Sequence, residues 1–208
     1  MGIVRAELFS TLDLVGQAPG GPDEDPVAFT FGGWQFPLLD DLTGEQLDAA
    51  YTGVDALLLG RRTYDIFAGY WPLQPSEGPD GTIAELFNRV PKYVVSRGRP
   101  LLDWEPTTLL GPDLTAEVDA LRARHELVSV VGSLGMLGTL LRLRLVDEID
   151  LWVHPILLGE GRTIFGTGTA PSRLELRADP VGSPKGVVLL QYRVIDGEPA
   201  TGDMSVRA

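Results

Sequence analysis

Short apolar runs alternate with amphipathic segments along this chain, and each pattern predicts one kind of element. Apolar runs of about four to eight residues between turn residues are typical of strands covered on both faces of a sheet. Apolar residues about three or four positions apart are typical of helices that bury one face. The alternation predicts an α/β fold, with a central, mixed and mostly parallel sheet and helices on both of its faces.

The expected elements can be placed along the sequence. Strands are predicted at residues 3–9, 54–59, 92–96, 107–110, 127–131 and 148–158, with an antiparallel edge pair at 173–178 and 186–195. Helices are predicted at 43–53, from 63 to 71, at 82–88, at 115–125, and from the glycine turn at 132–135 to about 145. We expect a single domain over residues 1–208, with a core at 1–195 and a loose polar tail at 196–208.

Capping signals mark two of these helices. A capping box of Thr43 with Gln46 is expected to begin the first helix, and Gly53 stands where a left-handed C-terminal residue belongs. Thr115 is the expected cap of the helix at 115–125.

The stretch from Leu127 to Phe165 contains a buried strand, the turn Gly132-Ser133-Leu134-Gly135, an apolar helix and a second strand. Gly132 can take a positive φ and lets a ligand approach the backbone closely. The helix that follows offers unpaired N–H groups and the positive end of its dipole, which suit a phosphate. This unit favours a nucleotide pocket, although an ordinary strand-to-helix connection also favours glycine.

A polar loop rich in glycine and proline runs from Ser10 to about Phe31. Loops of this length inside a compact domain are usually functional covers or disordered. Aromatic residues seek burial, and those at the end of the loop favour a partly ordered lid: Phe29, Phe31, Trp34 and Phe36. The alternative is a solvated acidic loop around Asp23-Glu24-Asp25.

The net charge of −12, from 17 basic and 29 acidic residues, changes the range of expected partners. Nucleic acid and anionic membranes both need a basic face, so neither is expected to bind. Without cysteine, disulfides and thiolate chemistry are excluded, and two histidines without clustered ligands give no expected metal site. The N-terminus lacks a signal-peptide pattern and no apolar run approaches about eighteen residues, so a cytoplasmic location is expected.

Basic and hydroxyl side chains follow three of the predicted strands, in Gly60-Arg61-Arg62-Thr63, Ser96-Arg97 and the Gly132–Gly135 turn. The carboxyl ends of parallel strands share one edge of a sheet, where ligands bind in such folds. A guanidinium forms bidentate, charge-assisted bonds with phosphate. Together these motifs favour a ligand with several phosphates, whereas each arginine alone is more simply explained as a solvated surface charge.

Three segments carry a family resemblance: LLLGRRTYDIFAGYWP, KYVVSR and VVGSLGMLGTLLRLRLVDEIDLWVHPILLGEGRTIF. Together, and above all in the Pro-x-x-Leu-Gly-x-Gly run from Pro155 to Gly161, they resemble the dihydrofolate reductase-like family. The branch is similar to the C-terminal reductase domain of bacterial riboflavin biosynthesis proteins. The resemblance covers almost the whole chain, and it implies a three-layer fold, an NADPH cofactor, a small-molecule substrate and a homodimer.

The resemblance also implies roles by position. Ser96 and Arg97 would hold the adenosine 2′-phosphate, which would favour NADPH over NADH. The loop from Asp13 to Ala18 would lie over the nicotinamide. The cofactor-binding candidates are Gly60, Arg61, Arg62, Thr63, Ser96, Arg97, Gly132, Ser133, Leu134, Gly135, Met136 and Leu137, the last six wrapping the pyrophosphate with backbone N–H groups.

Two features depart from the family pattern. Members often show Leu-Asp-Gly in the first loop, whereas Asp13 is followed here by Leu14. A positive φ costs leucine roughly 1 kcal/mol or more, so a differently shaped nicotinamide loop is expected. Dihydrofolate reductases hold their pterin with a carboxylate on the first helix, and neither Asp40 nor Asp41 matches it, so dihydrofolate activity is not expected.

The candidate proton donors are Asp13, Asp40 and His154, and each has a structural alternative. Asp13 could be a turn residue, Asp40 a helix cap, and His154 a packed histidine of an apolar strand. No proton donor is assigned. The candidate substrate-binding residues are Gln17, Trp34, Tyr70 and Trp71, whose aromatic members could equally belong to the core.

These observations favour an NADPH-dependent reductase of a small ring-containing metabolite. One alternative is a riboflavin-pathway reductase of 5-amino-6-(5-phosphoribosylamino)uracil type, against which the acidic lid argues because that substrate carries a phosphate. Another is a nucleotide-binding protein of the same fold without turnover, which Leu14 and the missing carboxylate would support.

Overall fold

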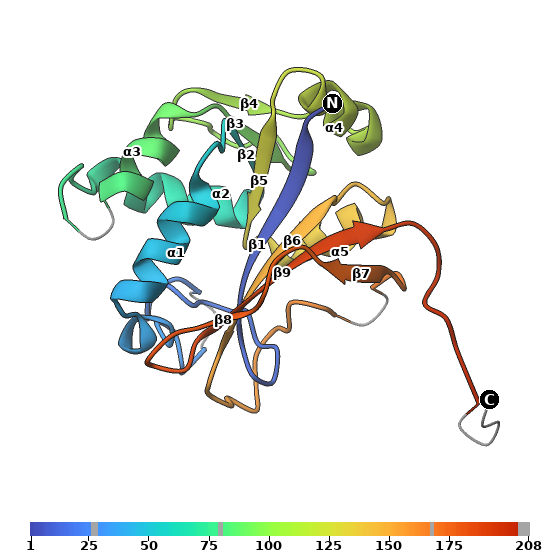
Figure 1. Cartoon of the computed structure of the whole chain (residues 1–208). Helices are drawn as coiled ribbons and strands as arrows, with labels where there is room; N and C mark the ends of the chain where they lie inside the picture. The colour runs from blue at the N-terminus through green and yellow to red at the C-terminus, as the bar shows by residue number, and fades with distance from the viewer. Residues whose placement is uncertain (26–28, 79–80, 167–168, 204–208) are drawn as a thin grey trace.

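The computed structural model describes residues 1–25, 29–78, 81–166 and 169–203, which fold around one nine-stranded sheet (Figure 1). The strands are β1 (Ile3–Thr11), β2 (Ala56–Gly60), β3 (Lys92–Val95), β4 (Thr107–Leu109), β5 (Leu127–Val131), β6 (Glu148–His154), β7 (Arg173–Leu176), β8 (Val181–Gly182) and β9 (Val188–Ile195). Their order across the sheet is β4-β3-β2-β5-β1-β6-β9-β7, and β8 also pairs with β9.

The strands from β4 to β6 in this order are parallel, whereas β9 runs antiparallel to β6, β7 and β8. The predicted mixed sheet and its antiparallel C-terminal pair are therefore confirmed. Strand β5 is inserted between β1 and β2 although it follows both in sequence. Its Val128 pairs with Val4 of β1 on one side and with Ala56 of β2 on the other.

Helices cover both faces of the sheet, as predicted (Figure 1). The α-helices are α1 (Asp41–Tyr51), α2 (Arg61–Tyr70), α3 (Gly81–Arg89), α4 (Leu114–Arg122) and α5 (Leu134–Arg142), and short 3-10 helices are η1 (Phe36–Leu38) and η2 (Trp71–Leu73). Buried residues of α1, α2 and α3 share one core cluster with Leu57 and Leu59 of β2. Those of α4 and α5 share the other with Leu58. The core is thus divided into two layers by the sheet.

The cap of the first helix differs from the prediction. Helix α1 begins at Asp41, and its N-cap is Asp40. The Asp40 carboxylate accepts hydrogen bonds from the Thr43 N–H (2.9 Å) and the Thr43 hydroxyl (2.8 Å). Thr43 is therefore a donor inside the helix, and the predicted capping box is wrong. Gly53 has a φ of +82°, which confirms the expected left-handed residue after the helix.

Other boundaries shift for local reasons. Helix α2 begins at Arg61 and not at Thr63, and α4 is capped by Asp113 and not by Thr115, because the Asp113 carboxylate accepts from the Ala116 N–H (3.1 Å). Helix α5 ends before residue 145, since Arg144 turns to a φ of 56°. Strand β6 ends at His154, before the predicted Leu158, where Pro155 lacks an N–H for a ladder.

Within the described ranges, no helix combines the length and the apolar character needed to cross a bilayer. Residues 204–208 of the predicted tail and residues 26–28 of the predicted lid lie outside the described residues.

Candidate functional site

The crevice between β2 and β5 lies where two helices leave the sheet on opposite faces. After β2 the chain enters α2, which packs with α1 and α3, whereas after β5 it enters α5 on the other face. Ligands of open α/β sheets bind outside the carboxyl ends of the strands at such a switch point. Two of the three sequence motifs therefore meet where this topology favours a ligand.

Hydrogen bonds bring three of the predicted cofactor residues together in this crevice, and Gly132 lies beside them. The Gly60 N–H donates to Ser133 Oγ (2.9 Å), and the Ser133 N–H donates to Thr63 Oγ1 (3.1 Å). Gly132 has a φ of +57°, and a Cβ added there would lie 3.8 Å from Thr63 Oγ1. The glycine thus takes the predicted conformation, and the two motifs are joined directly.

The first turn of α5 presents backbone donors at the mouth of this crevice. Leu134 and Gly135 begin the helix, where N–H groups have no partner within the helix. A Cβ added at Gly135 would meet nothing within 4 Å, so the space above it is open. Met136 and Leu137 differ, because their side chains are buried in the core and their N–H groups donate to the Ser133 carbonyl (2.8 and 2.9 Å). Their N–H groups are therefore already occupied.

The predicted arginines of α2 have carboxylate partners. Arg61 pairs with Asp65, one helical turn further on, at 2.6 Å. Arg62 lies 3.4 Å from Asp25 in the loop that follows β1. Both guanidiniums are about half exposed, and each has five N–H donors, so they can also bind an anion.

The motif after β3 lies beside the end of β2. Val95, the last residue of β3, pairs with Gly60, so Ser96 and Arg97 continue from the neighbouring strand end. The Ser96 hydroxyl accepts from the Gly98 N–H (3.1 Å), which fixes the turn, and Arg97 is exposed. Guanidiniums therefore follow two adjacent strands of this edge, despite the net charge of −12.

The lid, defined here as residues 12–25 and 29–35, is bonded to residues 156–164. Asp13 accepts hydrogen bonds from the Thr11 hydroxyl (2.5 Å), the Gly159 N–H (2.7 Å) and the Leu158 N–H (3.1 Å). The bond from Thr11, followed by that from Gly159, lowers the pKa of Asp13. The carboxyl is therefore ionised at neutral pH and acts as an anchor of the lid, which is a poor state for a proton donor.

Leu14 takes the left-handed conformation, with a φ of +65°. Its carbonyl accepts from the Ile164 N–H (2.9 Å), and the next residue, Val15, forms a bridge with Thr163. The expectation that leucine would avoid a positive φ here is wrong, because these contacts with the 156–164 segment offset its steric cost.

A buried ion cluster ties the lid to two other segments. The Asp25 carboxylate, with its side chain 4% exposed, lies 2.6 Å from Arg162, 2.9 Å from the Gln17 amide nitrogen and 3.4 Å from Arg62. The Gln17 amide oxygen accepts from the Arg162 N–H (2.8 Å). Both ends of the amide of Gln17, a predicted substrate residue, are thus occupied, one by Asp25 of the lid and the other by Arg162. Asp25 is charge-compensated by two arginines, so it does not act as an isolated negative charge.

The predicted aromatic wall falls into two separate groups. Trp34 is buried against His154, with ring centroids 5.0 Å apart, and its indole N–H donates to the Gln17 carbonyl (2.8 Å). Trp71 packs on Phe87 of α3 at 5.0 Å, and Tyr70 packs on Trp71. Among the described residues no ring contact joins Trp34 to the other two.

Asp40, the other candidate donor, is occupied as a cap. In addition to Thr43, the Lys185 N–H donates to its carboxylate (2.9 Å). Desolvation opposes ionisation, but the hydrogen bonds from Thr43 and Lys185 together outweigh it and lower the pKa of Asp40. This carboxylate joins α1 to the loop before β9, as the structural alternative for Asp40 predicted.

Glu7 is a perturbed carboxyl that the sequence patterns did not single out. It lies on β1 in register with Asp150 of β6, and both residues are fully buried. The Trp152 indole N–H donates to Glu7 Oε2 (3.3 Å), while Glu7 Oε1 has no partner among the described residues. Burial, and then the charge of Asp150, raises the pKa of Glu7 to about 8.

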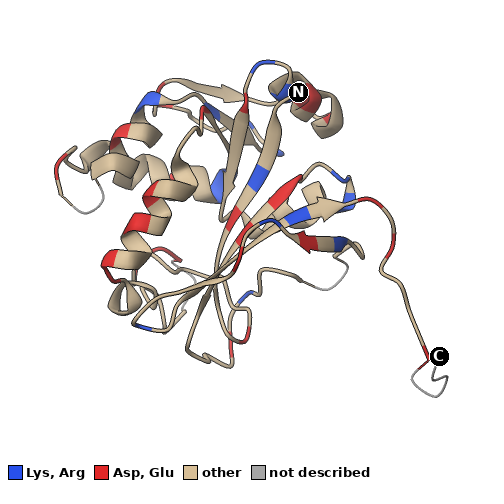
Figure 2. Cartoon of the chain, viewed as in Figure 1, with Lys and Arg blue, Asp and Glu red and all other residues tan. Residues whose placement is uncertain are grey.

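The charges around Glu7 explain this shift. Arg177 lies 2.5 Å from Asp150 and 3.5 Å from Glu148, and Arg5 lies 3.0 Å from Glu148 and 4.0 Å from Asp150, so two arginines compensate these two carboxylates. Figure 2 shows acidic and basic positions close together on the strands at the centre of the sheet. Glu7 is the additional acid, and it is protonated at neutral pH. The sequence does offer one sign of this buried acid, because Glu7 stands among the alternating residues of the predicted strand IVRAELF.

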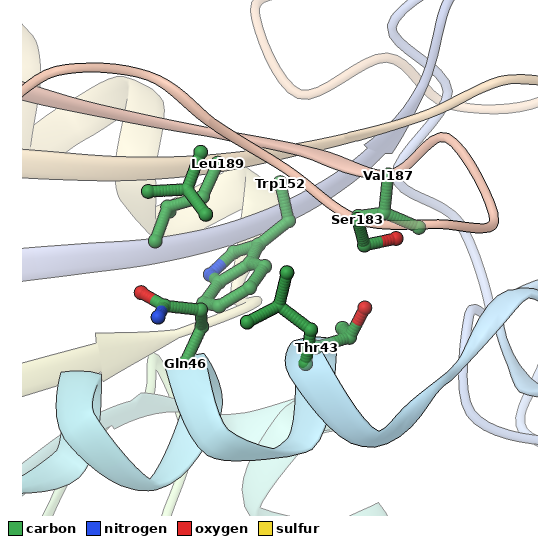
Figure 3. A pocket seen from close by; sticks show the side chains of 8 residues that line it. Thr43, Gln46, Trp152, Ser183, Val187 and Leu189 are labelled. Atoms are coloured by element: carbon green, nitrogen blue, oxygen red, sulfur yellow. The ribbon is translucent and has the colours of Figure 1, made fainter.

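A small hollow lies between α1 and strands β6, β8 and β9 (Figure 3). Thr43, Gln46, Trp152 and Leu189 are among its lining residues. It is shallow and mainly apolar. Within the described part of the chain, no group of three or more His, Cys, Asp or Glu side chains could hold a metal ion.

Comparison with known proteins agrees with this architecture. Residues 3–183 match the RibD C-terminal domain family. A crystal structure from Shewanella sp. PV-4, described as a riboflavin biosynthesis protein, superposes with a TM-score of 0.70 at 17% identity, covering 93% of this chain and 99% of that one. A pyrimidine reductase-like protein of Corynebacterium diphtheriae superposes with a TM-score of 0.61 at 16% identity, covering 94% of this chain and 93% of that one.

Two further relatives are longer than the region that they share with this chain. RibD of Acinetobacter baumannii superposes with a TM-score of 0.59 at 16% identity, covering 94% of this chain and 59% of that protein. The uncharacterised protein YyaP of Bacillus subtilis is 28% identical over 113 residues, which are 54% of this chain and 60% of YyaP. The structural neighbours confirm the dihydrofolate reductase-like fold implied by the resemblance. With a family match over residues 3–183, the chain belongs to the RibD C-terminal domain family.

Proposed function

We propose that this protein is an NADPH-dependent reductase that acts on a small ring-containing metabolite by hydride transfer. The observation that carries the proposal is the crevice between β2 and β5, where Gly60, Thr63 and Ser133 are hydrogen-bonded between two diverging helices. Membership of the RibD C-terminal domain family supports a reductase. The pyrimidine reductase-like description of a structural neighbour supports a ring-containing substrate.

The residues around the crevice fit a dinucleotide. The N–H groups of Leu134 and Gly135 and the open space above Gly135 would receive the pyrophosphate. Ser96 and Arg97 would hold the 2′-phosphate from the end of β3. NADPH, when bound, would supply the hydride. The protein's own part is to position the nicotinamide under residues 12–18 of the lid and to exclude water.

A riboflavin-pathway reductase of 5-amino-6-(5-phosphoribosylamino)uracil type remains the second candidate. The acidic lid argued against a phosphorylated substrate, but its Asp25 is buried and paired with Arg62 and Arg162. These two guanidiniums are 54% and 51% exposed, so they can attract a phosphate at the rim of the lid. The exposed guanidiniums therefore weaken the argument that the acidic lid would repel a phosphorylated substrate.

A binding protein without turnover is the third candidate. Leu14 no longer supports it, because the residue adopts the positive φ that was thought to be unfavourable. This candidate is still supported by the lack of a carboxylate that matches the pterin-binding one of dihydrofolate reductases, since Asp40 serves as the N-cap of α1. Consumption of NADPH with added pyrimidine and pterin substrates would separate this candidate from the two reductases.

The proposal is tested by titrating the purified protein with NADPH and with NADH while following nicotinamide fluorescence. Tight binding of NADPH with weak binding of NADH is the expected result, and it would justify a substrate screen. Binding of neither nucleotide would contradict the proposal and would leave the strand-end motifs as parts of the scaffold.

A further inference from the structure

Ser133 is the N-cap residue of α5, but its side chain does not cap that helix. Serine is among the favoured N-cap residues because its hydroxyl oxygen normally accepts a hydrogen bond from an N–H group of the first turn. Here the Ser133 hydroxyl oxygen accepts instead from the Gly60 N–H (2.9 Å), at the end of β2. A residue well suited to cap α5 is therefore bonded to the neighbouring strand.

The N–H groups at the start of α5 are of two kinds. Those of Met136 and Leu137 donate to the Ser133 carbonyl oxygen. Those of Leu134 and Gly135 have no acceptor among the described residues, and the space above Gly135 is open. A capping serine would accept from the second or third residue of the helix, which is Gly135 or Met136. Because the hydroxyl is bonded elsewhere, the Gly135 N–H stays available to a ligand.

A second hydrogen bond ties the same residue to α2. The Ser133 N–H donates to the Thr63 hydroxyl oxygen (3.1 Å), in the first turn of that helix. Gly60, which donates to the Ser133 hydroxyl, is the N-cap residue of α2. Ser133 is thus an acceptor and a donor toward the start of one neighbouring helix, and its own N–H is not free for a ligand.

The two helix starts also pack closely at this point. A Cβ added at Gly60 would lie 3.4 Å from the Ser133 hydroxyl oxygen and 3.6 Å from the Met136 Cβ. A Cβ added at Gly132 would lie 3.8 Å from the Thr63 hydroxyl oxygen. Two hydrogen bonds and this packing therefore hold the start of α5 against the start of α2.

This arrangement has two costs for the fold. Ser133 has a φ of +53° and a ψ of +42°, in the left-handed region that disfavours residues other than glycine. The loss of a normal side-chain cap is a second cost for α5. Glycine at this position would remove the first cost, but it would also remove the oxygen that accepts from Gly60. Strain that persists beside a ligand crevice is typical of functional positions.

We propose that Ser133 is a positioning residue for the diphosphate of the dinucleotide. It joins the start of α5 to the start of α2, and it leaves the Leu134 and Gly135 N–H groups unpaired and fixed in place for phosphate oxygens. This role rests on the proposed function, because it gives Ser133 a task in the same cofactor site. Donors that are already fixed lose less freedom on binding, so Ser133 raises the affinity for diphosphates in particular.

Isothermal titration calorimetry of the full chain with three ligands tests this role. NADPH and ADP carry a diphosphate, whereas adenosine 2′-monophosphate has only the phosphate that is expected to lie near Arg97. Ser133→Gly accepts the left-handed conformation without strain and lacks the hydroxyl, so we expect it to bind NADPH and ADP about tenfold more weakly than wild type. Its affinity for adenosine 2′-monophosphate should be unchanged, because that ligand has no diphosphate.

Further variants separate the hydroxyl from the backbone effect of glycine. Ser133→Ala retains a Cβ and should lose the same affinity for both diphosphates. Ser133→Cys places a weak sulfur acceptor near the position of the oxygen and should recover part of that affinity. Asp113→Ala, which removes the side chain that caps α4, is the matched control. It should lower the melting temperature and leave all three affinities unchanged, whereas Ser133→Gly should show the reverse pattern.

Equal binding of NADPH and ADP by wild type and by Ser133→Ala would overturn this role and leave the reductase proposal standing. A similar weakening of all three ligands would also overturn it, because a general structural loss affects every ligand. If wild type binds ADP but not NADPH, the reductase proposal fails, while a tenfold loss of ADP affinity in Ser133→Ala still supports the role of Ser133. A wild type that binds neither diphosphate overturns both.

Discussion

Glu7 of β1 and Asp150 of β6 lie side by side in register inside the protein, and of the two only Asp150 has an ion pair with an arginine among the described residues. Two acids this close in a desolvated layer cannot both ionise cheaply, so the pair shares one charge. The proton stays on Glu7, whose pKa rises to about 8. This relationship links the stability of the central strands to pH.

The first prediction concerns this pH dependence. A carboxyl whose pKa is about 8 when folded and 4.5 otherwise binds its proton more tightly in the folded state. Its contribution to stability is complete below pH 4.5 and is lost as the pH rises to about 8. Glu7→Gln, which cannot ionise, should therefore be more stable than wild type at pH 9, by up to about 5 kcal/mol. Urea unfolding at pH 5 and pH 9 measures the difference.

Glu45→Gln, at an exposed position of α1, is the matched control, and it should show no such pH-dependent gain. A Glu7→Gln variant whose advantage over wild type is the same at both pH values would show that Glu7 does not retain its proton.

The second prediction concerns the ion cluster of the lid. Arg162→Ala removes the partner that lies 2.6 Å from the buried Asp25 carboxylate, while the longer contact to Arg62 and the bond from the Gln17 amide stay. We expect a loss of about 1–3 kcal/mol in the free energy of unfolding and faster amide hydrogen exchange in residues 12–25. Adding Asp25→Asn should restore part of this loss, because the buried charge that Arg162 compensated is removed.

Arg89→Ala serves as the control for that variant, because Arg89 pairs with Glu85 on the surface of α3 and should contribute only about 0–1 kcal/mol. Equal effects of Arg162→Ala and Arg89→Ala would mean that the cluster does not hold the lid.

The third prediction separates the two nicotinamide nucleotides. Arg97→Ala should weaken NADPH by about 10-fold to 100-fold, the equivalent of one or two charge-assisted bonds, and leave NADH almost unchanged. Arg99→Ala is the neighbouring control, exposed in the same loop. Fluorescence titration of both variants with both nucleotides is the measurement. An equal loss of NADPH and NADH affinity in Arg97→Ala would remove the 2′-phosphate assignment.

The fourth prediction concerns self-association. Strand β7 is at the edge of the sheet, and its Leu174 and Leu176 are 43% and 48% exposed. An exposed edge strand with apolar side chains can pair with another chain, so we expect a homodimer that buries this strand. Light scattering of Leu174→Glu/Leu176→Glu should show a monomer. Leu73→Glu, at the exposed η2, should leave the dimer intact. A monomeric wild type would contradict the expectation.

The sheet and the crevice were predictable because their signals are local. The apolar runs and the glycine turn after Val131 depend on backbone conformation and burial, which sequence patterns report directly. The error at Thr43 has a different origin. Thr43 and Asp40 are both good caps, and the choice of Asp40 depends on a bond from Lys185, which is distant in sequence.

The candidate substrate residues could not be sorted from sequence for the same physical reason. The Gln17 amide is hydrogen-bonded to Asp25 and Arg162, and the Trp71 ring packs on Phe87. The hydrophobic pattern of the sequence does not indicate any of these three partners. Leu14 shows that a local steric preference can be overridden by the segment that packs against it. The raised pKa of Glu7 could not be predicted either, because it depends on Asp150 of the neighbouring strand.

The insertion of β5 between β1 and β2 has a consequence for folding during synthesis. Until residues 127–131 leave the ribosome, β2 can pair only with β3, and β1 has no partner strand because its neighbours β5 and β6 both come later in the sequence. The hydrogen bond from Gly60 to Ser133, which spans 73 positions, cannot form before Ser133 has been synthesised. Such distant pairings form slowly. A nascent chain truncated before β5 would therefore have strands but no place for a nucleotide, and its unpaired strand edges would make it prone to aggregate.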